Sequence, residues 1–360
     1  MNTYLLPKIQ STIIISPTSN PDNITNPYIS FSLFKYHIEI LNEITTICIN
    51  KNINLNDMLK IMNPYEYIFN KIPGINISVS KLNFKTYLFY DLFEIFVTLN
   101  IFNIYKYPIK ILHLTNNYDS IECIKMLRDN YTDEIHIYDK INNTIINLIE
   151  NTKFHFLYFE SIETNLIKYI NSLIEFIMII FKNQEFNGTC ILKINTILFK
   201  PIIDILYILS TLYNKVYILK PTTSNLTSSD KYIVCKKFEP SEINNSHLML
   251  NYSKLNIILS DNPNTNIISL LNYDISLYFK MKINDINIIM GNQQLEILNS
   301  LMNLLMNKNK KDKIELMSKT NIQKSILWCE KFKISYNILS DKNNIFLPQF
   351  KHDNLIEQFI

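Results

Sequence analysis

The chain of 360 residues contains no alanine, a single arginine (Arg128) and only three glycines, Gly74, Gly188 and Gly291. It is rich instead in isoleucine, asparagine, lysine and tyrosine, a bias typical of AT-rich coding DNA. This composition weakens arguments from helix propensity, because isoleucine and asparagine fill helices in which alanine would normally serve. The lack of glycine bears on function, because a loop that passes close to a bound ligand often needs backbone conformations that a Cβ would block.

Charge and cysteine content exclude further classes. The net charge of +3 is near neutral for this length, so no overall basic field indicates a nucleic-acid partner. The five cysteines are far apart, odd in number and form no Cys-x-x-Cys pair, which argues against a metal site and against a disulfide framework. Reduced thiols predict a cytoplasmic protein. The most apolar segments, 173–181 and 202–213, carry Glu175 and Asp204 and are shorter than a membrane span, so we expect a soluble protein with no membrane partner.

The chain divides by pattern into three zones. Residues 1–83 predict an extended arm followed by helices at 33–49 and 55–62, and residues 239–360 predict a helical C-terminal appendage with helices at 293–306 and 322–332. Residues 84–238 alternate helices and strands. Such alternation predicts an α/β domain with a doubly wound, Rossmann-like and mostly parallel sheet. The strands expected in this middle zone are 109–114, 134–139, 154–159, 189–194, 215–220 and 231–238. The helices expected between them are 89–102, 118–127, 141–150, 165–181 and 201–213.

The stretch from Gly188 to Phe238 organises this interpretation. It predicts a strand, a helix that begins at Pro201, a second strand stopped by Pro221, a polar loop at Thr222–Ser229 and a third strand. The loop is too short to contain a crossover helix, so the last two strands should pair antiparallel.

This stretch resembles the FtsJ-like family of RNA ribose 2'-O-methyltransferases, and most of all its cap-modifying members in large DNA viruses. The resemblance rests on LKI at Leu192–Ile194, the following helix, and VYILKP-T-TS-N-SSDKYIVC up to Cys235. With the upstream strands it covers about half of the chain. It implies a methyltransferase sheet, S-adenosylmethionine as cofactor, RNA at the mRNA cap or 5' end as partner, and a place in the capping machinery beside another protein. If the chain is viral, the resemblance implies the host cytoplasm or the virion as its location.

The cofactor positions of the family are altered here. The family has a glycine-rich turn after its first strand, and this chain has Asn116, Asn117, Tyr118 and Asp119 at the corresponding positions. Asparagine tolerates a left-handed backbone, so a turn can still form, but a bulky Tyr118 at the point of closest approach conflicts with a bound cofactor. Asp139 ends the second strand, where the family's acid accepts hydrogen bonds from the adenosine ribose; an ordinary loop acid explains it equally well.

The catalytic positions are altered as well. The family uses a Lys-Asp-Lys-Glu set, in which a lysine of lowered pKa deprotonates the ribose hydroxyl. By motif, the corresponding residues are Asp91, Glu160, Lys193 and Asp230. Three acids around one lysine favour the ammonium form of Lys193, and an ammonium cannot act as a base. The other interpretation of Lys193 is a lysine at a strand end whose charged head reaches solvent.

Three hypotheses follow. The first is a catalytically degenerate methyltransferase fold that acts as an RNA-binding or stimulatory subunit. The second is an active RNA 2'-O-methyltransferase with a remodelled loop and another base, such as Lys85. The third is an unrelated doubly wound protein. RNA binding would use lysines and tyrosines near the last two strands, as stacking platforms with basic neighbours. These are Tyr217, Lys220, Lys231, Tyr232, Lys236 and Lys237.

Overall fold

A computed structural model describes residues 1–20, 26–82, 84, 86–261, 265–307 and 310–337. The chain forms two compact units, each built from separate segments. Unit 1 consists of Met1–Phe31, Phe96–Lys220 and Asp230–Ile288, and unit 2 of Ser32–Ile95, Pro221–Ser229 and Ile289–Ile360. These units do not follow the three sequence zones, because both ends of the chain and the middle zone are divided between them.

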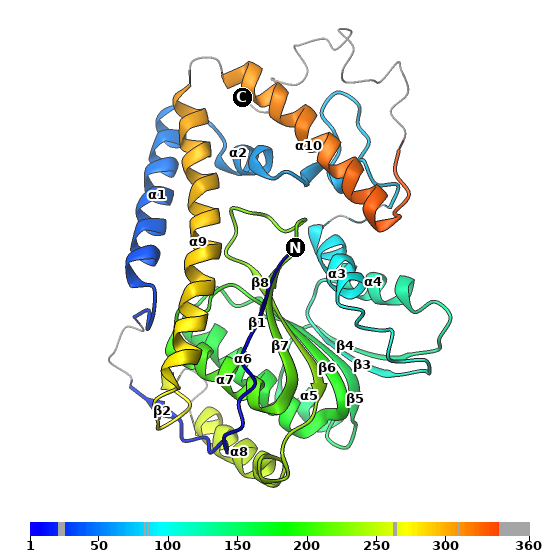
Figure 1. The fold of residues 1–360 in the computed structure, drawn as a ribbon, viewed down its shortest axis with the longest axis vertical. Helices are drawn as coiled ribbons and strands as arrows, with labels where there is room; N and C mark the ends of the chain where they lie inside the picture. Colours follow the sequence, from blue (N-terminus) through cyan, green and yellow to red (C-terminus); the bar gives the residue numbers. More distant parts are fainter. Residues whose placement is uncertain (21–25, 83, 85, 262–264, 308–309, 338–360) are drawn as a thin grey trace. The chain divides into compact units, whose positions relative to one another are not determined.

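Unit 1 contains a seven-stranded sheet in the order β1-β7-β8-β6-β5-β3-β4 (Figure 1). Its strands are β1 (Asn2–Leu5), β3 (Lys110–Leu114), β4 (Glu134–Tyr138), β5 (Phe154–Glu160), β6 (Gln184–Ile194), β7 (Tyr213–Lys220) and β8 (Lys231–Phe238). Strands β4, β3, β5 and β6 run parallel, and β8 pairs antiparallel with both β6 and β7. The α/β class, the mostly parallel sheet and the antiparallel pairing of the last two predicted strands are therefore confirmed.

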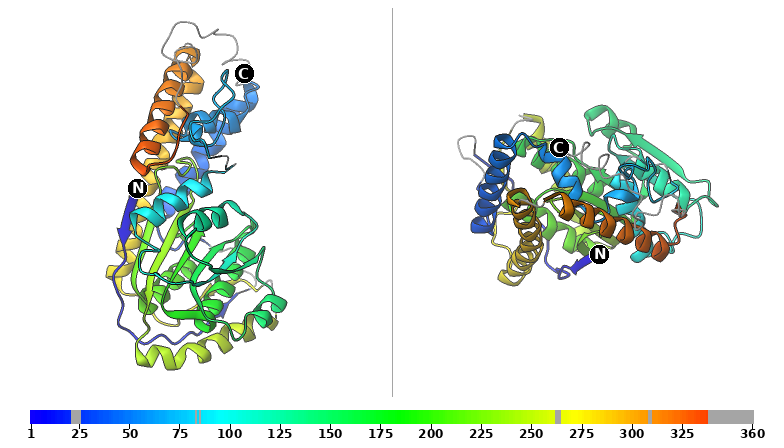
Figure 2. Two further views of the ribbon diagram at one scale, coloured as in Figure 1. Left: turned by 90° about the vertical axis from the view of Figure 1, so that its right-hand side faces the viewer. Right: turned by 90° about the horizontal axis from the view of Figure 1, so that it is seen from above.

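Helices flank this sheet, and most coincide with predicted segments. In unit 1 they are α4 (Asp119–Leu127), α5 (Asn143–Leu148), α6 (Leu166–Asn183), α7 (Lys200–Leu212) and α8 (Glu242–Asp261). The local sequence explains where they begin. The Asn165 side chain caps α6 by accepting from the backbone N–H groups of Ile167 and Lys168, and Pro201 lies in the first turn of α7. The two views in Figure 2 show α8 (yellow-green) along the outer side of this unit.

Three parts of unit 1 were not predicted as they are. The N-terminal arm forms β1, which pairs antiparallel with β7 and becomes the edge strand of the sheet. Helix α8 has no counterpart among the predicted helices. A two-stranded ribbon, β2 (Thr18–Ser19) with β9 (Ile267–Ser269), was not predicted either.

Unit 2 is helical. It contains α1 (Phe31–Asn50) from Ser32 onward, α2 (Leu55–Met62), the 3-10 turn η1 (Glu66–Ile68) and α10 (Lys310–Phe332). Helices α3 (Tyr87–Thr98) and α9 (Leu277–Met306) each contribute residues to both units. Apolar residues from α1, α2, α9 and α10 make one core, as helices with an apolar stripe must bury it against one another. Its members include Ile44, Met58, Ile61, Leu298 and Leu301. None of the helices in the described ranges is long and apolar enough to cross a bilayer.

Candidate functional site

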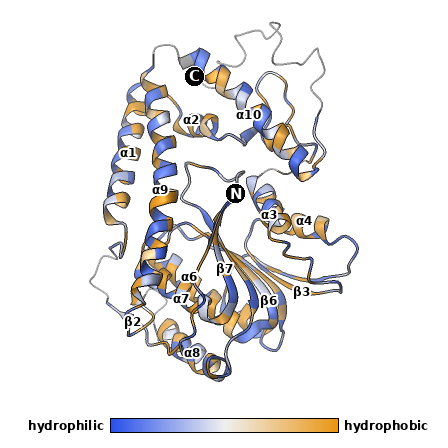
Figure 3. Ribbon diagram, in the orientation of Figure 1, coloured by the Kyte–Doolittle hydropathy of each residue, from blue (hydrophilic) through white to orange (hydrophobic). Residues whose placement is uncertain are grey.

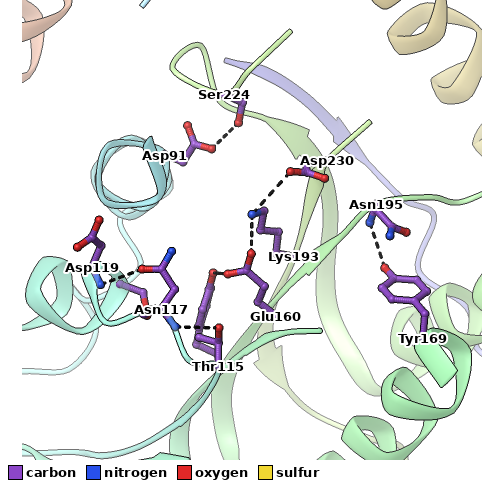
Figure 4. Close-up of polar contacts among 12 residues, drawn as sticks. Asp91, Thr115, Asn117, Asp119, Glu160, Tyr169, Lys193, Asn195, Ser224 and Asp230 are labelled. Atoms are coloured by element: carbon purple, nitrogen blue, oxygen red, sulfur yellow. Dashed lines mark hydrogen bonds and ion pairs between the residues drawn. The ribbon is translucent and has the colours of Figure 1, made fainter. Parts of the chain in front are cut away.

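The candidate site lies where the direction of the sheet's winding changes. From β3 the chain passes through α4 to β4 on one side, whereas β5 and β6 extend the sheet on the other. In open α/β sheets, ligands bind beyond the carboxyl ends of the strands at such a switch point. Polar side chains gather at these strand ends, among them Glu160, Lys193 and Asp230 (Figure 4).

A lysine between two carboxylates forms the centre of this edge. Lys193, near the end of β6, lies in register with Glu160 at the end of β5, and its Nζ is 2.6 Å from Glu160 Oε1. Asp230, directly before β8, places Oδ2 3.6 Å from the same Nζ. The Tyr158 hydroxyl donates to Glu160 Oε2 at 3.4 Å. Three of the four predicted catalytic positions thus form one ion-paired cluster, on three strands separated in sequence.

The fourth predicted position, Asp91, has different partners. It lies in α3, in the part of the chain that belongs to unit 2, and its side chain is fully buried. Its carboxylate accepts hydrogen bonds from the hydroxyls of Thr223 and Ser224, both at 2.5 Å. One turn later, Glu94 accepts from the backbone N–H and the hydroxyl of Thr222. Helix α3 therefore holds the Ser/Thr-rich loop through two carboxylates, a role that the sequence did not reveal.

The turn after β3 is built without glycine. The buried Thr115 hydroxyl accepts from the Asn117 backbone N–H at 3.3 Å, and Asn117 Oδ1 accepts from the Asp119 N–H at 3.1 Å, where α4 begins. Each residue of this turn is described and none has a positive φ. A turn without glycine therefore does form here, and it needs no left-handed residue because side-chain hydrogen bonds of the Asx type close it. Asn116 is exposed.

Tyr118 and Asp139 meet across this turn. The Tyr118 hydroxyl donates to Asp139 Oδ1 at 3.2 Å, and the ring is 55% exposed. The hydrogen bond to Asp139 and the charge of that carboxylate raise the pKa of the Tyr118 hydroxyl. An oxygen of the one acid that the resemblance assigns to a ribose is thus already used by a side chain of this protein.

A buried histidine is hydrogen-bonded to this turn through Ser120. His113 in β3 stacks on Tyr158 with ring centroids 5.4 Å apart, and its Nε2 forms a hydrogen bond with the Ser120 hydroxyl. Burial lowers the pKa of His113 to about 4, so the ring is neutral near pH 7. Ser120 in turn donates to the backbone carbonyl of Asn117. No sequence signal singles out this histidine, because one His in an apolar strand is most often a packed residue.

Two of the six residues predicted for RNA stacking are not on the surface. Tyr232 is fully buried and Lys231 nearly so, whereas Tyr217, Lys220 and Lys236 are half-buried. Burial, and secondarily the Lys220 cation, lower the pKa of Lys231 to about 7. Lys236 donates to the Leu99 carbonyl at 2.6 Å. Lys237 remains exposed and forms an ion pair with Glu239.

No protein-family model matches the chain, and no curated protein matches it. Among the described residues, no group of three or more His, Cys, Asp or Glu side chains could hold a metal ion. Lys85, the alternative base, lies outside the described residues. The assignment of a function therefore depends on the geometry of the site.

Proposed function

We propose that this chain is an FtsJ-like methyltransferase fold that no longer binds S-adenosylmethionine, and that it acts as a non-catalytic, RNA-binding or stimulatory subunit in mRNA capping or a related RNA modification. Two features support the ancestry. β8, the last strand of this sheet in chain order, lies antiparallel between β6 and β7, and three positions assigned from the family motif form a single ion-paired cluster. The motif assignment predicts acids around Lys193, and Glu160 and Asp230 do lie beside it.

The observation that carries the loss of cofactor binding is the hydrogen bond from Tyr118 to Asp139. A ribose can bind Asp139 in the usual way only if that tyrosine moves. In the turn between β3 and α4, the side chains of Thr115, Asn117 and Ser120 form hydrogen bonds to the backbone of the turn itself. These groups are therefore not available to a ligand. A methyl donor would have to displace Tyr118, and this turn has no glycine to let the backbone pass close to the donor.

A second candidate function is an active ribose 2'-O-methyltransferase. It is favoured by the assembled Glu160–Lys193–Asp230 cluster, which a chain under no selection at this site would have little reason to keep. Against it, two carboxylates near Lys193 favour the ammonium, and Asp91 occupies the position of the family's first lysine.

Isothermal titration of the full chain with S-adenosylmethionine distinguishes the two functions. We expect no saturable heat at ligand concentrations up to about 1 mM, which corresponds to a binding free energy weaker than about −4 kcal/mol. The Tyr118→Gly variant, which frees Asp139, should bind more tightly than the wild-type chain. Micromolar binding by the wild-type chain, or methyl transfer to a capped RNA, would overturn the proposal in favour of the active enzyme.

A further inference from the structure

Helix α8 presents an apolar stripe to solvent on the side opposite its packed face. Its packed face consists of Asn244, Leu248, Asn251 and Leu255, all buried in unit 1. The opposite face carries large apolar side chains, Ile243, Leu250 and Ile257, which are 58%, 49% and 60% exposed. A helix that is apolar on two opposite faces normally has both covered. Figure 3 shows the resulting mixture of apolar (orange) and polar segments along α8.

The exposed stripe follows a seven-residue repeat. The three large residues recur every seventh position, and a serine follows each of them three residues later. The resulting seam, termed the α8 seam, consists of Ile243, Ser246, Leu250, Ser253, Ile257 and Ser260, all of them exposed. Apolar residues at a strict seven-residue spacing form the contact line of a coiled coil, with the large side chains at a and the serines at d.

The serines are compatible with close helix packing. Their hydroxyls donate back to carbonyls of the same helix, as Ser246 does to Ile243 at 2.7 Å and Ser253 to Met249 at 2.9 Å. With the hydroxyl satisfied internally, each serine presents a small surface that a larger side chain from another helix can cover. Charged residues are confined to Glu242 and Asp261 at the two ends and to Lys254, so little charge must be desolvated along the seam.

The alternation of large and small residues selects the orientation of the partner. If two copies of α8 cross antiparallel about a two-fold axis that passes between Leu250 and Ser253 of the seam, every large side chain faces a serine of the other copy. Ile243 then faces Ser260, Leu250 faces Ser253, and Ile257 faces Ser246, and each contact occurs twice. In a parallel pair, large residues would meet large ones and serines would meet serines, which leaves gaps in alternate layers.

We propose that the α8 seam is the interface of a homodimer in which two α8 helices pack antiparallel. The 20 residues of α8 give a helix about 30 Å long. A contact of this length lies at the small end of the range of specific interfaces, about 1,200 Å² in total, so we expect dissociation in the micromolar range. The inference is independent of the proposed function, because no residue of the seam belongs to the candidate site.

Sedimentation velocity of the full chain tests the interface. The wild-type chain should be mainly dimeric at about 50 µM and dissociate on dilution. Leu250→Glu should weaken the dimer at least about tenfold by burying a charge. Because Leu250 is exposed in the monomer, circular dichroism and thermal unfolding should be unchanged at dilutions where both chains are monomeric. The control is Leu277→Glu, an equally apolar and 70% exposed residue of α9, which should leave the dimer intact. A monomeric wild-type chain at this concentration would overturn the proposal, as would a dimer that is insensitive to Leu250→Glu.

Cysteine cross-linking tests the orientation. Ile243→Cys and Ser260→Cys are prepared as separate variants and mixed under mild oxidation. The antiparallel pairing predicts a disulfide-linked dimer containing one copy of each variant, and little cross-linking of either variant alone. The native cysteines in the described part of the chain are buried and should not compete. Efficient cross-linking of each variant with itself, but not in the mixture, would show a parallel pair and refute the proposed geometry.

Discussion

At the scale of single residues, the protein contains carboxyl groups whose titration should be visible in its stability. Glu175 in α6 is half-buried, and burial, followed by the nearby Glu163 carboxylate, raises the pKa of Glu175 to about 7. A raised pKa means that the folded state binds more protons than the unfolded state between about pH 4.5 and 7. Stability contributed by this group is therefore greatest at low pH and is lost as the pH rises through that window.

The prediction is that Glu175→Gln stabilises the protein in a pH-dependent way. At pH 5 variant and wild type should unfold with nearly equal free energies, and at pH 8 the variant should be more stable by roughly 2 kcal/mol, because the wild-type chain must then hold an ionised carboxylate in a poorly solvated position. Urea unfolding at several pH values measures the difference. Glu122→Gln, at an exposed position of α4, is the control and should show no such trend. A gain from Glu175→Gln that stays constant with pH would contradict the assignment.

From the sequence, motif spacing predicted which residues of the site lie together, but it did not predict which side chains are exposed to solvent. The contact of Lys193 with Glu160 and Asp230 follows from positions assigned by motif alone. The proposed stacking role of Tyr232 failed because its side chain is buried, and a hairpin recognised in a sequence does not reveal which faces of its strands other segments will cover. Here residues 231–235 are all buried, so both faces of that part of β8 are covered.

At the scale of secondary-structure elements, most of the strands and helices of the middle zone were predictable because their apolar periodicity is strong. Helix α8 was missed for an identifiable reason. Two of its buried positions are asparagines, and their side chains pair with the backbone of the N-terminal arm. Asn244 Oδ1 accepts from the Ile13 N–H at 2.8 Å, and Asn251 Oδ1 accepts from the Ile15 N–H at 3.0 Å. Polar residues on the packed face break the pattern that identifies an amphipathic helix.

Strand β1 was missed for a different reason. A short N-terminal strand is stabilised by the edge that it joins, and here that edge is the side of β7 that is not paired with β8. The pairing therefore depends on long-range topology rather than on the sequence of residues 2–5.

The retained glycines give an element-scale prediction. A Cβ at Gly188, in β6, would lie 2.8 Å from the Glu185 carbonyl oxygen, 2.9 Å from that of His155 and 2.1 Å from Gln184 Nε2. Backbone carbonyls in a sheet cannot easily move, so Gly188→Ala should destabilise the protein by about 2 kcal/mol. This explains why a chain with so few glycines keeps one here.

Gly291→Ala is the matched control for that prediction. A Cβ at Gly291, within α9, would meet the side-chain end of Leu33 at 2.5 Å. Leu33 can change rotamer, and alanine gains about 1 kcal/mol of helix propensity over glycine, so the net effect should be near zero. Urea unfolding of both variants should separate them clearly. Equal destabilisation by the two substitutions would show that the backbone around Gly188 is softer than the structure indicates.

At the scale of the whole molecule, the two units are not consecutive pieces of the chain. Unit 2 takes residues from three places, including the loop Pro221–Ser229 between β7 and β8. That loop is held within unit 2 by Asp91 and Glu94 from α3, and by Gln294 of α9, whose Nε2 donates to the Thr227 carbonyl at 2.7 Å. Glu94 is further held by the Trp328 indole N–H at 3.2 Å. A sequence-based division at single boundaries could not reveal this, since the connection depends on side-chain hydrogen bonds between distant segments.

The last prediction concerns Asp91, which the resemblance assigns to catalysis and the structure to the architecture of unit 2. Asp91→Ala leaves the buried hydroxyls of Thr223 and Ser224 without the acceptor that they have in the native fold. At roughly 1–2 kcal/mol for each buried hydroxyl, we expect a loss of about 3 kcal/mol in unfolding free energy. Amide hydrogen exchange in residues 221–229 should accelerate, whereas exchange in β3 and β5 should change little. Asp57→Ala in α2, which removes only a surface ion pair with Lys60, is the control and should cost under about 0.5 kcal/mol.

Unchanged stability and unchanged exchange in Asp91→Ala, combined with loss of a methyl-transfer activity, would instead place Asp91 in a catalytic set and favour the active-enzyme alternative. Destabilisation with accelerated exchange of the loop would show that Asp91 holds residues 221–229 to α3 within unit 2.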